Sequence, residues 1–292
     1  MKARRFSSFI KLTRIEHGVF AGIVPVATYL LTTNHVNIIT LIILYMTTLL
    51  AEVYLFVLND IMNIEEDKIN RPWAPLVRGE IRLREAYVIV AISLFLGIVL
   101  VLLSYITNLL NTISLAVYIT AIIVGTLYNI YLKRLPLVGN FATSLTTSLT
   151  FLYGMMKISI IPIVMFLISI FACLGRELIK SIIDIEGDKV AGLRTLPIVK
   201  GVEFCLKLAK AFEITALVIF GYLLMYSLIM HNIYMMLTIG IGFIVSSAII
   251  IKTLFLRNQN DVNDFESARR GILNAMFIVI LTYFMYSVVT LL

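Results

Sequence analysis

Residues 37–72 read NIITLIILYMTTLLAEVYLFVLNDIMNIEEDKINRP, an apolar run that ends in a cluster of acids. The run from 37 to 58 carries a single charge, Glu52, and the ~30 Å hydrocarbon core of a bilayer needs roughly 20 apolar residues to cross. The acids from Asp60 to Asp67 are costly to place in lipid, so they mark a membrane surface. The stretch predicts a transmembrane helix that delivers an acidic segment to one face of a membrane.

The composition of the whole chain extends this pattern. With 60% hydrophobic and 14% charged residues among 292, a soluble domain would lack the polar residues needed to cover its surface. We therefore predict one all-α polytopic membrane domain over residues 1–292 with nine transmembrane helices. Apolar runs of spanning length occur at 15–33, 37–58, 86–105, 111–131, 140–156, 161–183, 205–228, 233–254 and 270–291.

The distribution of positive charge predicts the orientation of these helices. Of the 24 Lys and Arg residues, all but Lys157 fall at or near the helix ends that share a side with the N-terminus. Basic residues collect on the cytoplasmic side of membrane proteins. We expect a multi-pass protein of the cell membrane, with the N-terminus and the acidic loops in the cytoplasm and the C-terminus outside. Topology thus accounts for the net charge of +7, and no nucleic-acid partner is expected.

A second copy of the acidic segment follows the sixth predicted helix. Asn63-Ile-Glu-Glu-Asp-Lys68 aligns without a gap with Asp184-Ile-Glu-Gly-Asp-Lys189, and Pro75-Leu-Val-Arg-Gly79 then aligns with Pro197-Ile-Val-Lys-Gly201 after one residue of slippage. Both copies follow an even-numbered helix, so the halves share one orientation and an axis along the membrane normal would relate them. The two acidic clusters can then face one another across a central cavity. The predicted half repeats are residues 15–131 and 140–254, followed by the helix at 270–291.

The spacing within each copy suggests metal chemistry. Asp60, Asn63 and Asp67 fall on one face of a helix end, and Asp184 and Asp188 do the same. Carboxylates stacked this way repel unless a divalent cation neutralises them, and oxygen ligands without paired His or Cys indicate Mg²⁺ rather than Zn²⁺. Because Mg²⁺ shares its coordination with phosphate, the two half-sites could clamp a diphosphate. The alternative is a pair of solvated helix ends.

Basic residues near the clusters could contact phosphate. Lys68 and Lys189 stand out because they occupy matching positions in the repeat. Each basic residue also has a simpler interpretation as an ordinary cytoplasmic-side charge. Glu52 differs from these surface charges, since it lies within a predicted span, where it would face the cavity or pair with a cation.

Taken together, these motifs resemble the UbiA superfamily of intramembrane prenyltransferases over nearly the full chain. The first family motif, N-D-x-x-D-x-x-x-D followed by N-R-P, falls on residues 59–72, and the second, D-x-x-x-D leading into G-x-x-T-L-P, falls on residues 184–197. The stretch 128–140 is similar to the family's connection after its fourth helix, and Arg14-Ile-Glu-His17 is similar to the start of its first. The resemblance implies nine transmembrane helices around a lipid-open cavity, with two aspartate motifs that bind Mg²⁺ and a prenyl diphosphate.

The resemblance also implies roles for individual residues. Asp60, Asp67, Asp184 and Asp188 would be catalytic, and together with Asn63 they would hold Mg²⁺. Tyr128, Tyr131 and Tyr153 are candidates to face an allylic cation, and Arg176 and Lys180 could hold a phosphate on the acceptor. The residues expected to bind substrate are Asn59, Asn63, Lys68, Arg71, Tyr128, Lys133, Arg176, Lys180, Lys189 and Arg14.

Three further stretches are most similar to the archaeal branch of the superfamily: Lys133-Arg-x-Pro-Leu-x-Gly-Asn140, Thr150-Phe-Leu-Tyr-Gly154 and Gly175-Arg-Glu-x-Ile-Lys180. That branch implies transfer of a geranylgeranyl group from geranylgeranyl diphosphate to the free hydroxyl of geranylgeranylglyceryl phosphate, a step of archaeal ether-lipid synthesis. One alternative is an aromatic acceptor, such as 4-hydroxybenzoate or another quinone precursor, with Arg14 as its anchor. Another is a non-catalytic protein that binds or transports lipid.

Two residues depart from the family pattern. Asn63 stands where the first motif has its middle aspartate, and Ser181 stands where the archaeal branch has an additional aspartate. In the repeat, Ser181 aligns with Asp60 and Asn63 aligns with Asp184, so each half keeps two of three possible acids. Since Asn offers a carbonyl oxygen but no charge, we expect weaker Mg²⁺ binding than in an all-aspartate relative.

Overall fold

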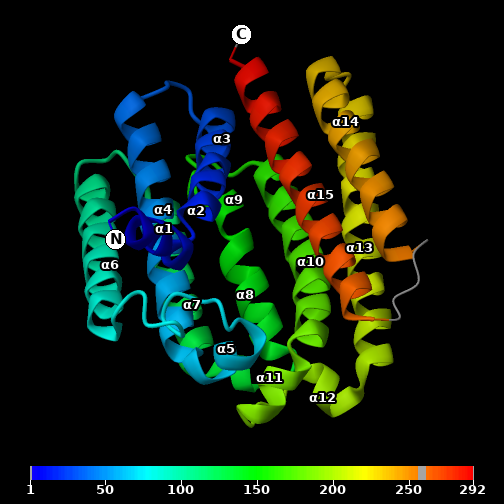
Figure 1. Ribbon diagram of the computed structural model, residues 1–292. Coiled ribbons are helices and arrows are strands. Elements are labelled where there is room, and N and C mark those ends of the chain that lie inside the picture. The colour runs from blue at the N-terminus through cyan, green and yellow to red at the C-terminus, as the bar shows by residue number, and fades with distance from the viewer. Residues whose placement is uncertain (1, 256–260, 292) are drawn as a thin grey trace.

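A computed structural model describes residues 2–255 and 261–291, with side chains from residue 5 onward, and they form a bundle of helices (Figure 1). Within those ranges, eight helices are long and apolar enough to cross a membrane, which confirms a polytopic all-helical membrane protein. These spans are Ile15–Thr32 (α2, Ile15–Ala21, and α3, Ile23–Thr32), α4 (Ile38–Met62), α6 (Leu83–Ile106), α7 (Thr112–Ile130), α10 (Ile160–Ile183), α13 (Val202–Ile229), Ile233–Phe255 (α14, Ile233–Ile250, and the π-helical η2, Ile251–Phe255) and α15 (Val262–Val289).

The fifth predicted span is a broken helix. α8 (Val138–Ser148) and α9 (Thr150–Tyr153) follow one another between α7 and α10, with a break at Leu149 (Figure 1). Ser148 is fully buried and its hydroxyl donates to Ser169 on α10 at 2.9 Å. Small side chains of this kind let helices approach closely in a membrane. Together α8 and α9 cover the predicted helix at 140–156, so the described part of the chain is compatible with nine crossings.

Several short helices lie outside the spans. α5 (Ile64–Asn70), α11 (Ile185–Val190) and α12 (Leu196–Lys200) gather at the end of the bundle away from the C-terminus (Figure 1). α1 (Lys2–Thr13) packs against α4, and a turn of 3-10 helix, η1 (Leu132–Arg134), connects α7 to α8. The residues that carry charge in the sequence motifs are therefore brought to one end of the bundle.

The apolar residues divide between a core and an outer surface. One core cluster around Met165, Phe220 and Tyr283 joins α10, α13 and α15, and others pack around α4. Large apolar side chains also point outward, among them Ile106, which is 72% exposed, and Phe95, which is 66% exposed. Such exposure is expected where lipid rather than water surrounds the bundle.

The last helix begins earlier than its sequence indicated. α15 starts at Val262, not near 270, because the Asp261 side chain accepts a hydrogen bond from the Asp264 backbone N–H at 2.9 Å and caps the helix. The prediction was wrong because residues 262–270 are largely polar and look like a loop. The earlier start places Glu266 and Arg269 on a helix that packs against α10.

The two acidic segments share one local backbone structure. α4 ends at Met62 and α5 begins at Ile64, with Asn63 between them; α10 ends at Ile183 and α11 begins at Ile185, with Asp184 between them. Asn63 and Asp184 are the residues that align in the sequence. This match supports the duplication, while the bounds of the two halves stay a prediction.

Candidate active site

The two acidic segments are tied to each other at the end of the bundle. α5 packs against α11, and Asn70 bridges them: its side-chain oxygen accepts from the Gly187 N–H at 3.1 Å, and its amide donates to the Asp184 carbonyl at 3.4 Å. A Cβ atom at Gly187 would overlap the Asn70 side chain. The glycine that replaces an acid in the second copy therefore lets the two copies approach.

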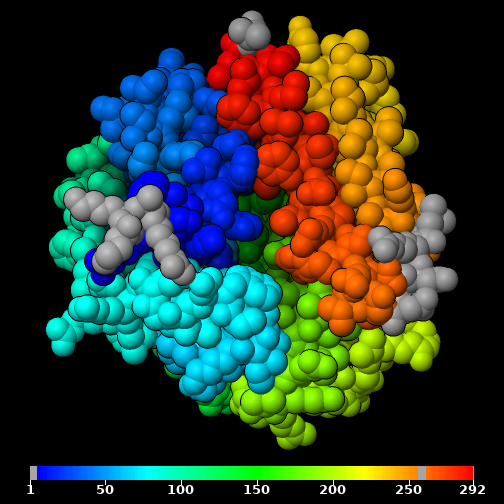
Figure 2. All heavy atoms as spheres, in the orientation of Figure 1, coloured from blue at the N-terminus to red at the C-terminus, as the bar shows by residue number. Residues whose placement is uncertain are grey.

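A cavity of about 1480 Å³ extends from this junction into the bundle. Figure 2 shows a recess between α2–α3 (blue), α5 (cyan) and α15 (orange), with green atoms from the middle of the chain at its floor. Polar residues from both copies line the cavity at one end, and the rest of its wall combines apolar residues with a second set of charged ones. The predicted site residues on its wall are Arg14, Asn59, Asn63, Asp67, Arg71, Tyr128, Lys133, Arg176, Lys180, Asp184 and Asp188.

In the first copy, arginines neutralise both aspartates. Asp60 is buried and contacts Arg14 at 2.5 Å and Arg71 at 3.1 Å, while Arg71 also reaches Asp67 at 3.4 Å. Arg14 has a left-handed backbone conformation between α1 and α2, and its guanidinium lies over the Phe56 ring at 4.7 Å. Asp60 does not line the cavity itself, but its two partners Arg14 and Arg71 do.

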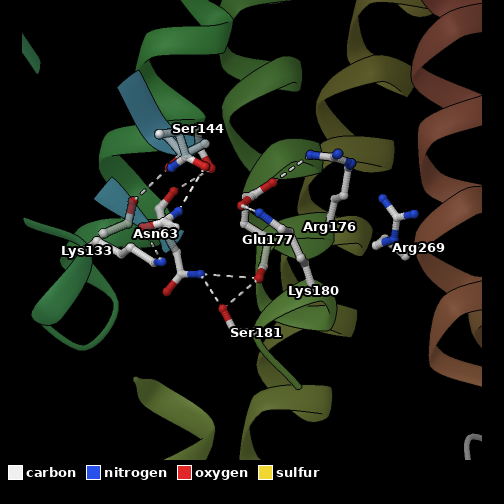
Figure 3. Close-up of polar contacts among 12 residues, drawn as sticks. Asn63, Lys133, Ser144, Arg176, Glu177, Lys180, Ser181 and Arg269 are labelled. Atoms are coloured by element: carbon white, nitrogen blue, oxygen red, sulfur yellow. Dashed lines mark hydrogen bonds and ion pairs between the residues drawn. The ribbon is translucent and has the colours of Figure 1, made fainter. Parts of the chain in front are cut away.

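The asparagine in the first copy contacts a lysine from the connection after α7. The Asn63 side-chain oxygen accepts from Lys133 Nζ at 2.9 Å, and Lys133 also forms an ion pair with Glu66 (Figure 3). The Asn63 amide donates to Asn59 at 2.9 Å, and Asn59 donates to Asn129 at 2.8 Å. This chain of hydrogen bonds fixes the Asn63 carbonyl oxygen beside a cation at the cavity wall.

The second copy is different, because its carboxylates have no such partners. Among the described residues, neither Asp184 nor Asp188 has a basic side chain within ion-pair distance. The aligned Ser181 accepts a hydrogen bond from Asn140 at 2.9 Å and donates to the Glu177 carbonyl at 2.9 Å (Figure 3). Burial raises the pKa of Asp188 to about 6, and it raises the pKa of Asp184 above its usual range.

Burial also raises the pKa of Asp67 to about 6, with Arg71 opposing the shift. Buried carboxyls with raised pKa values are poorly solvated as anions and would gain from a cation. Among the described residues, no three His, Cys, Asp or Glu side chains converge closely enough to hold a metal ion by themselves. An ion at this site would therefore need oxygen atoms from a ligand or water as well, an arrangement typical of Mg²⁺ bound with phosphates.

A second group of charges lies on the far wall of the cavity. From α10, Arg176 contacts Glu177 at 2.5 Å and Lys180 lies 4.0 Å from Glu177. From α15, Arg269 forms two hydrogen bonds of 2.7 Å with Glu266. Figure 3 shows Arg269 reaching from α15 toward the α10 residues. Glu266 and Arg269 were not predicted as site residues because the predicted last helix began after them, although their i, i+3 spacing is a helical signal.

Several predicted residues lie away from the cavity. Lys68 is exposed and pairs with Glu65 at 2.7 Å, and Lys189 is exposed on α11. Of the three candidate tyrosines only Tyr128 lines the cavity, since Tyr131 is exposed and Tyr153 is buried against Thr47. Matching positions in the repeat thus did not predict the direction of the lysine side chains.

Two acids lie within the membrane spans, and only one of them was singled out from the sequence. Glu52 lines the cavity, one of the two outcomes expected for it. Glu213 on α13 was not singled out, yet it lines the cavity, is 0% exposed, and neither carboxyl oxygen has a hydrogen-bond partner among the described residues. Burying a polar group without a hydrogen-bond partner costs free energy, so the Glu213 carboxyl would be stabilised by a hydrogen-bond donor at the cavity wall.

Comparison with known proteins agrees with this architecture. The family model described as the UbiA prenyltransferase family matches residues 20–281. A relative from Methanoculleus marisnigri named digeranylgeranylglyceryl phosphate synthase is 34% identical over 200 residues, which are 67% of this chain and 69% of that protein. One of the same name from Pyrococcus furiosus is 31% identical over 269 residues, which are 90% of each.

Solved structures share the fold along nearly the whole chain. A structure described as giving insights into digeranylgeranylglyceryl phosphate synthase in membranes is 27% identical, with a TM-score of 0.70 over 99% of each chain. A UbiA homologue from Archaeoglobus fulgidus, solved with GPP and Mg²⁺, is 18% identical, with a TM-score of 0.68 over 93% of this chain and 99% of that one. At that identity the likeness concerns the fold alone.

Proposed function

This chain belongs to the UbiA prenyltransferase family, and we propose that it transfers a geranylgeranyl group from geranylgeranyl diphosphate to the free hydroxyl of geranylgeranylglyceryl phosphate. The observation that carries the proposal is the meeting of two aspartate half-sites at one end of a cavity with apolar walls. The relative from Pyrococcus furiosus, which aligns over 90% of both chains, bears the name of a synthase of this type.

The residues at the junction fit Mg²⁺ together with a diphosphate. We assign Asp67, Asp184 and Asp188 as the carboxylate ligands, with the Asn63 carbonyl oxygen beside them, because all four line the cavity. Asp60, which the sequence grouped with them, is engaged by Arg14 and Arg71 and supports the site through those cations. When bound, Mg²⁺ would neutralise negative charge on the diphosphate as it leaves.

Residues of this chain supply the remaining requirements of the reaction. Lys133 and Arg71 place positive charge at the cavity wall where the bond between prenyl C1 and the diphosphate oxygen breaks and its electron pair leaves with the diphosphate. The apolar wall keeps the allylic cation from water, and the Tyr128 ring offers a π face to it. The acceptor hydroxyl oxygen forms the new bond to C1 and releases its proton.

An aromatic acceptor is less well supported. Its expected anchor, Arg14, already forms an ion pair with Asp60 and lies against Phe56. Releasing Arg14 would leave a buried carboxylate without this partner, which is costly. A non-catalytic role is disfavoured because the carboxylates gather around a cavity with basic residues, an arrangement that suits phosphate chemistry.

We further propose that the end of the bundle with α5, α11 and the N-terminus faces the cytoplasm and that the C-terminus lies outside. Lys157, the one basic residue assigned to the outside, lies in the connection before α10, where its Nζ contacts Asn34 at 3.3 Å. The basic residues around α5, η1 and α12 are at the opposite end, which agrees with the preference of positive charge for the cytoplasmic side.

A direct test is to incubate the purified protein with geranylgeranyl diphosphate, Mg²⁺ and either geranylgeranylglyceryl phosphate or 4-hydroxybenzoate. We expect the diether product from the lipid phosphate and none from the aromatic acid. A prenylated ring would favour the aromatic alternative. Failure of both acceptors, with prenyl donors of several lengths, would favour the lipid-binding protein.

A further inference from the structure

The charged residues on the far wall of the cavity form a group of their own, although Lys180 and Arg269 lie within electrostatic range of Asp184 in the second half-site. We call Arg176, Glu177 and Lys180 of α10 and Glu266 and Arg269 of α15 the α10–α15 cluster. All five line the cavity. Glu177 lies within electrostatic range of Arg176, Lys180 and Arg269 together. The cluster therefore holds three cations against two carboxylates and keeps a net positive charge.

Two groups at this wall have unmet hydrogen-bonding needs. The Nε atom of Arg176 is buried and has no acceptor, and both carboxyl oxygens of Glu213 are buried without a donor among the described residues. Glu213 lies beside the backbone that carries Arg176: a Cβ atom at Gly175, the residue before Arg176, would lie 2.4 Å from a Glu213 oxygen. A ligand that carries both an anion and a hydroxyl would satisfy both groups, because the anion accepts from the buried donor and the hydroxyl donates to the buried acceptor.

We propose that the α10–α15 cluster binds the phosphate of a phosphorylated glycerol lipid and that Glu213 accepts a hydrogen bond from the free hydroxyl of the same head group. The identity of this lipid as the prenyl acceptor rests on the proposed function. A phosphate monoester carries close to two negative charges near neutral pH, which matches three cations better than a single carboxylate would. Arg176 and Arg269 also offer planar donor groups that suit phosphate oxygens.

The arrangement separates the two anions of the reaction. The diphosphate would lie with Asp67, Asp188 and Lys133, whereas the acceptor phosphate would lie with residues of α10 and α15. Glu177 and Glu266 hold Arg176 and Arg269 in place before the lipid arrives. The phosphate then accepts hydrogen bonds from the N–H groups of these arginines that the glutamates leave free. Arg269 has its Nε and Nη2 atoms engaged by Glu266, which fixes the orientation of its third nitrogen, Nη1.

The phosphate half of the proposal is tested with Arg269→Gln and the matched control Arg270→Gln. Arg270 also lines the cavity and contacts the same Glu266, at 2.8 Å, but its side chain is 71% exposed, so water solvates its charge. We expect Arg269→Gln to raise the KM for geranylgeranylglyceryl phosphate about tenfold or more and to leave the KM for geranylgeranyl diphosphate unchanged. With geranylgeranylglycerol, which lacks the phosphate, Arg269→Gln and wild type should be equal. An equal loss with both acceptors, or no loss with either, would overturn the phosphate site.

Direct binding separates this proposal from the proposed function. Binding of geranylgeranylglyceryl phosphate is measured without Mg²⁺ or donor, for wild type, Arg269→Gln and Arg270→Gln. Weaker binding by Arg269→Gln alone supports the cluster even if no transfer occurs, in which case the proposed function fails by itself. Transfer by wild type with binding that is indifferent to Arg269 leaves the function standing and removes the cluster.

The hydroxyl half is tested with Glu213→Leu and Glu213→Gln. Leu removes an unsatisfied carboxyl from an apolar wall, so the melting temperature should stay equal or rise while transfer falls about tenfold or more. Gln keeps a carbonyl oxygen that can accept from the hydroxyl, and it should restore part of the transfer rate. Full transfer by Glu213→Leu would contradict a contact with the substrate. Loss of transfer together with a lowered melting temperature in both variants would indicate a structural role instead.

Discussion

The two acidic half-sites share a local backbone structure but differ in the ion pairs that their aspartates form. At α4–α5, Asp60 and Asp67 are neutralised by Arg14 and Arg71, whereas at α10–α11 Asp184 has no ion-pair partner among the described residues. One half therefore pairs its aspartates with arginines, whereas the other half keeps its aspartates out of ion-pair contact with the described basic side chains. The position of an acid in the repeat does not determine its role; its ion-pair partners do.

The largest expected effect comes from the open half-site. Asp188→Asn removes a buried, unpaired carboxylate from the cavity, and we expect prenyl transfer to fall by about 100-fold or more. Folding should suffer little, because burial disfavours the ionised form of Asp188 more than Lys133 favours it and raises its pKa to about 6. Assays of transfer and melting temperature check this. Near-normal transfer by Asp188→Asn would break the comparison between the halves.

The paired half-site should behave in the opposite way. Asp60→Asn leaves Arg14 and Arg71 without their shared buried partner, and breaking such a pair typically costs about 3 kcal/mol or more. We therefore expect a clear drop in melting temperature, larger than for Asp188→Asn, with a smaller loss of transfer. Thermal unfolding in detergent without Mg²⁺ measures it. Equal melting temperatures for the two variants would remove the distinction.

Competition between protons and Mg²⁺ for the carboxylates gives a further test of the two half-sites. Burial raises the pKa values of Asp67 and Asp188 to about 6, so both carboxyls are ionised above that pH and protonated below it. Because Mg²⁺ must displace these protons, the Mg²⁺ concentration for half-maximal transfer should rise about tenfold for each carboxyl, about 100-fold in all, as pH falls from about 8 to about 5. Asp67→Asn should weaken this dependence. A midpoint independent of pH would contradict carboxylate ligands with raised pKa values.

A smaller effect is expected from a change at Asn63, the amide residue of the first copy. Asn63→Asp places a carboxylate next to Lys133, whose Nζ is 2.9 Å from the present side-chain oxygen. We expect the Mg²⁺ midpoint to fall about threefold, because the new charge adds to the ligand set. Ser181→Asp in the second copy is the matched comparison. An unchanged midpoint in Asn63→Asp would show that this position does not reach the ion.

The smallest effects are expected for the two lysines at aligned positions in the repeat. Lys68→Gln and Lys189→Gln change exposed side chains that do not line the cavity, so transfer should stay within about twofold of wild type. Lys133→Gln serves as the contrasting variant, since Lys133 lies on the cavity wall. A large loss in Lys68→Gln or Lys189→Gln would mean that these side chains turn inward when substrate binds.

The sequence predicted what depends on local pattern. Run length indicated the spans, and the repeat located Asn63 and Asp184 at matching helix junctions. The pairing of Asp60 with Arg14 joins residues far apart in the chain, and no spacing rule indicates it. The start of α15 was missed because Asp261 caps a polar helical segment that composition alone assigns to a loop. Side-chain direction and long-range pairing depend on packing, which the sequence does not display.

The central claim is that both half-sites share one Mg²⁺-diphosphate, and anomalous scattering tests it most directly. The protein would be crystallised with Mn²⁺ in place of Mg²⁺ and a non-reactive thio analogue of geranylgeranyl diphosphate. We expect anomalous density at the junction of α5 and α11, in contact with Asp67, with Asp184 or Asp188, and with the diphosphate. Density bound by one half-site alone, or density away from the junction, would contradict the account.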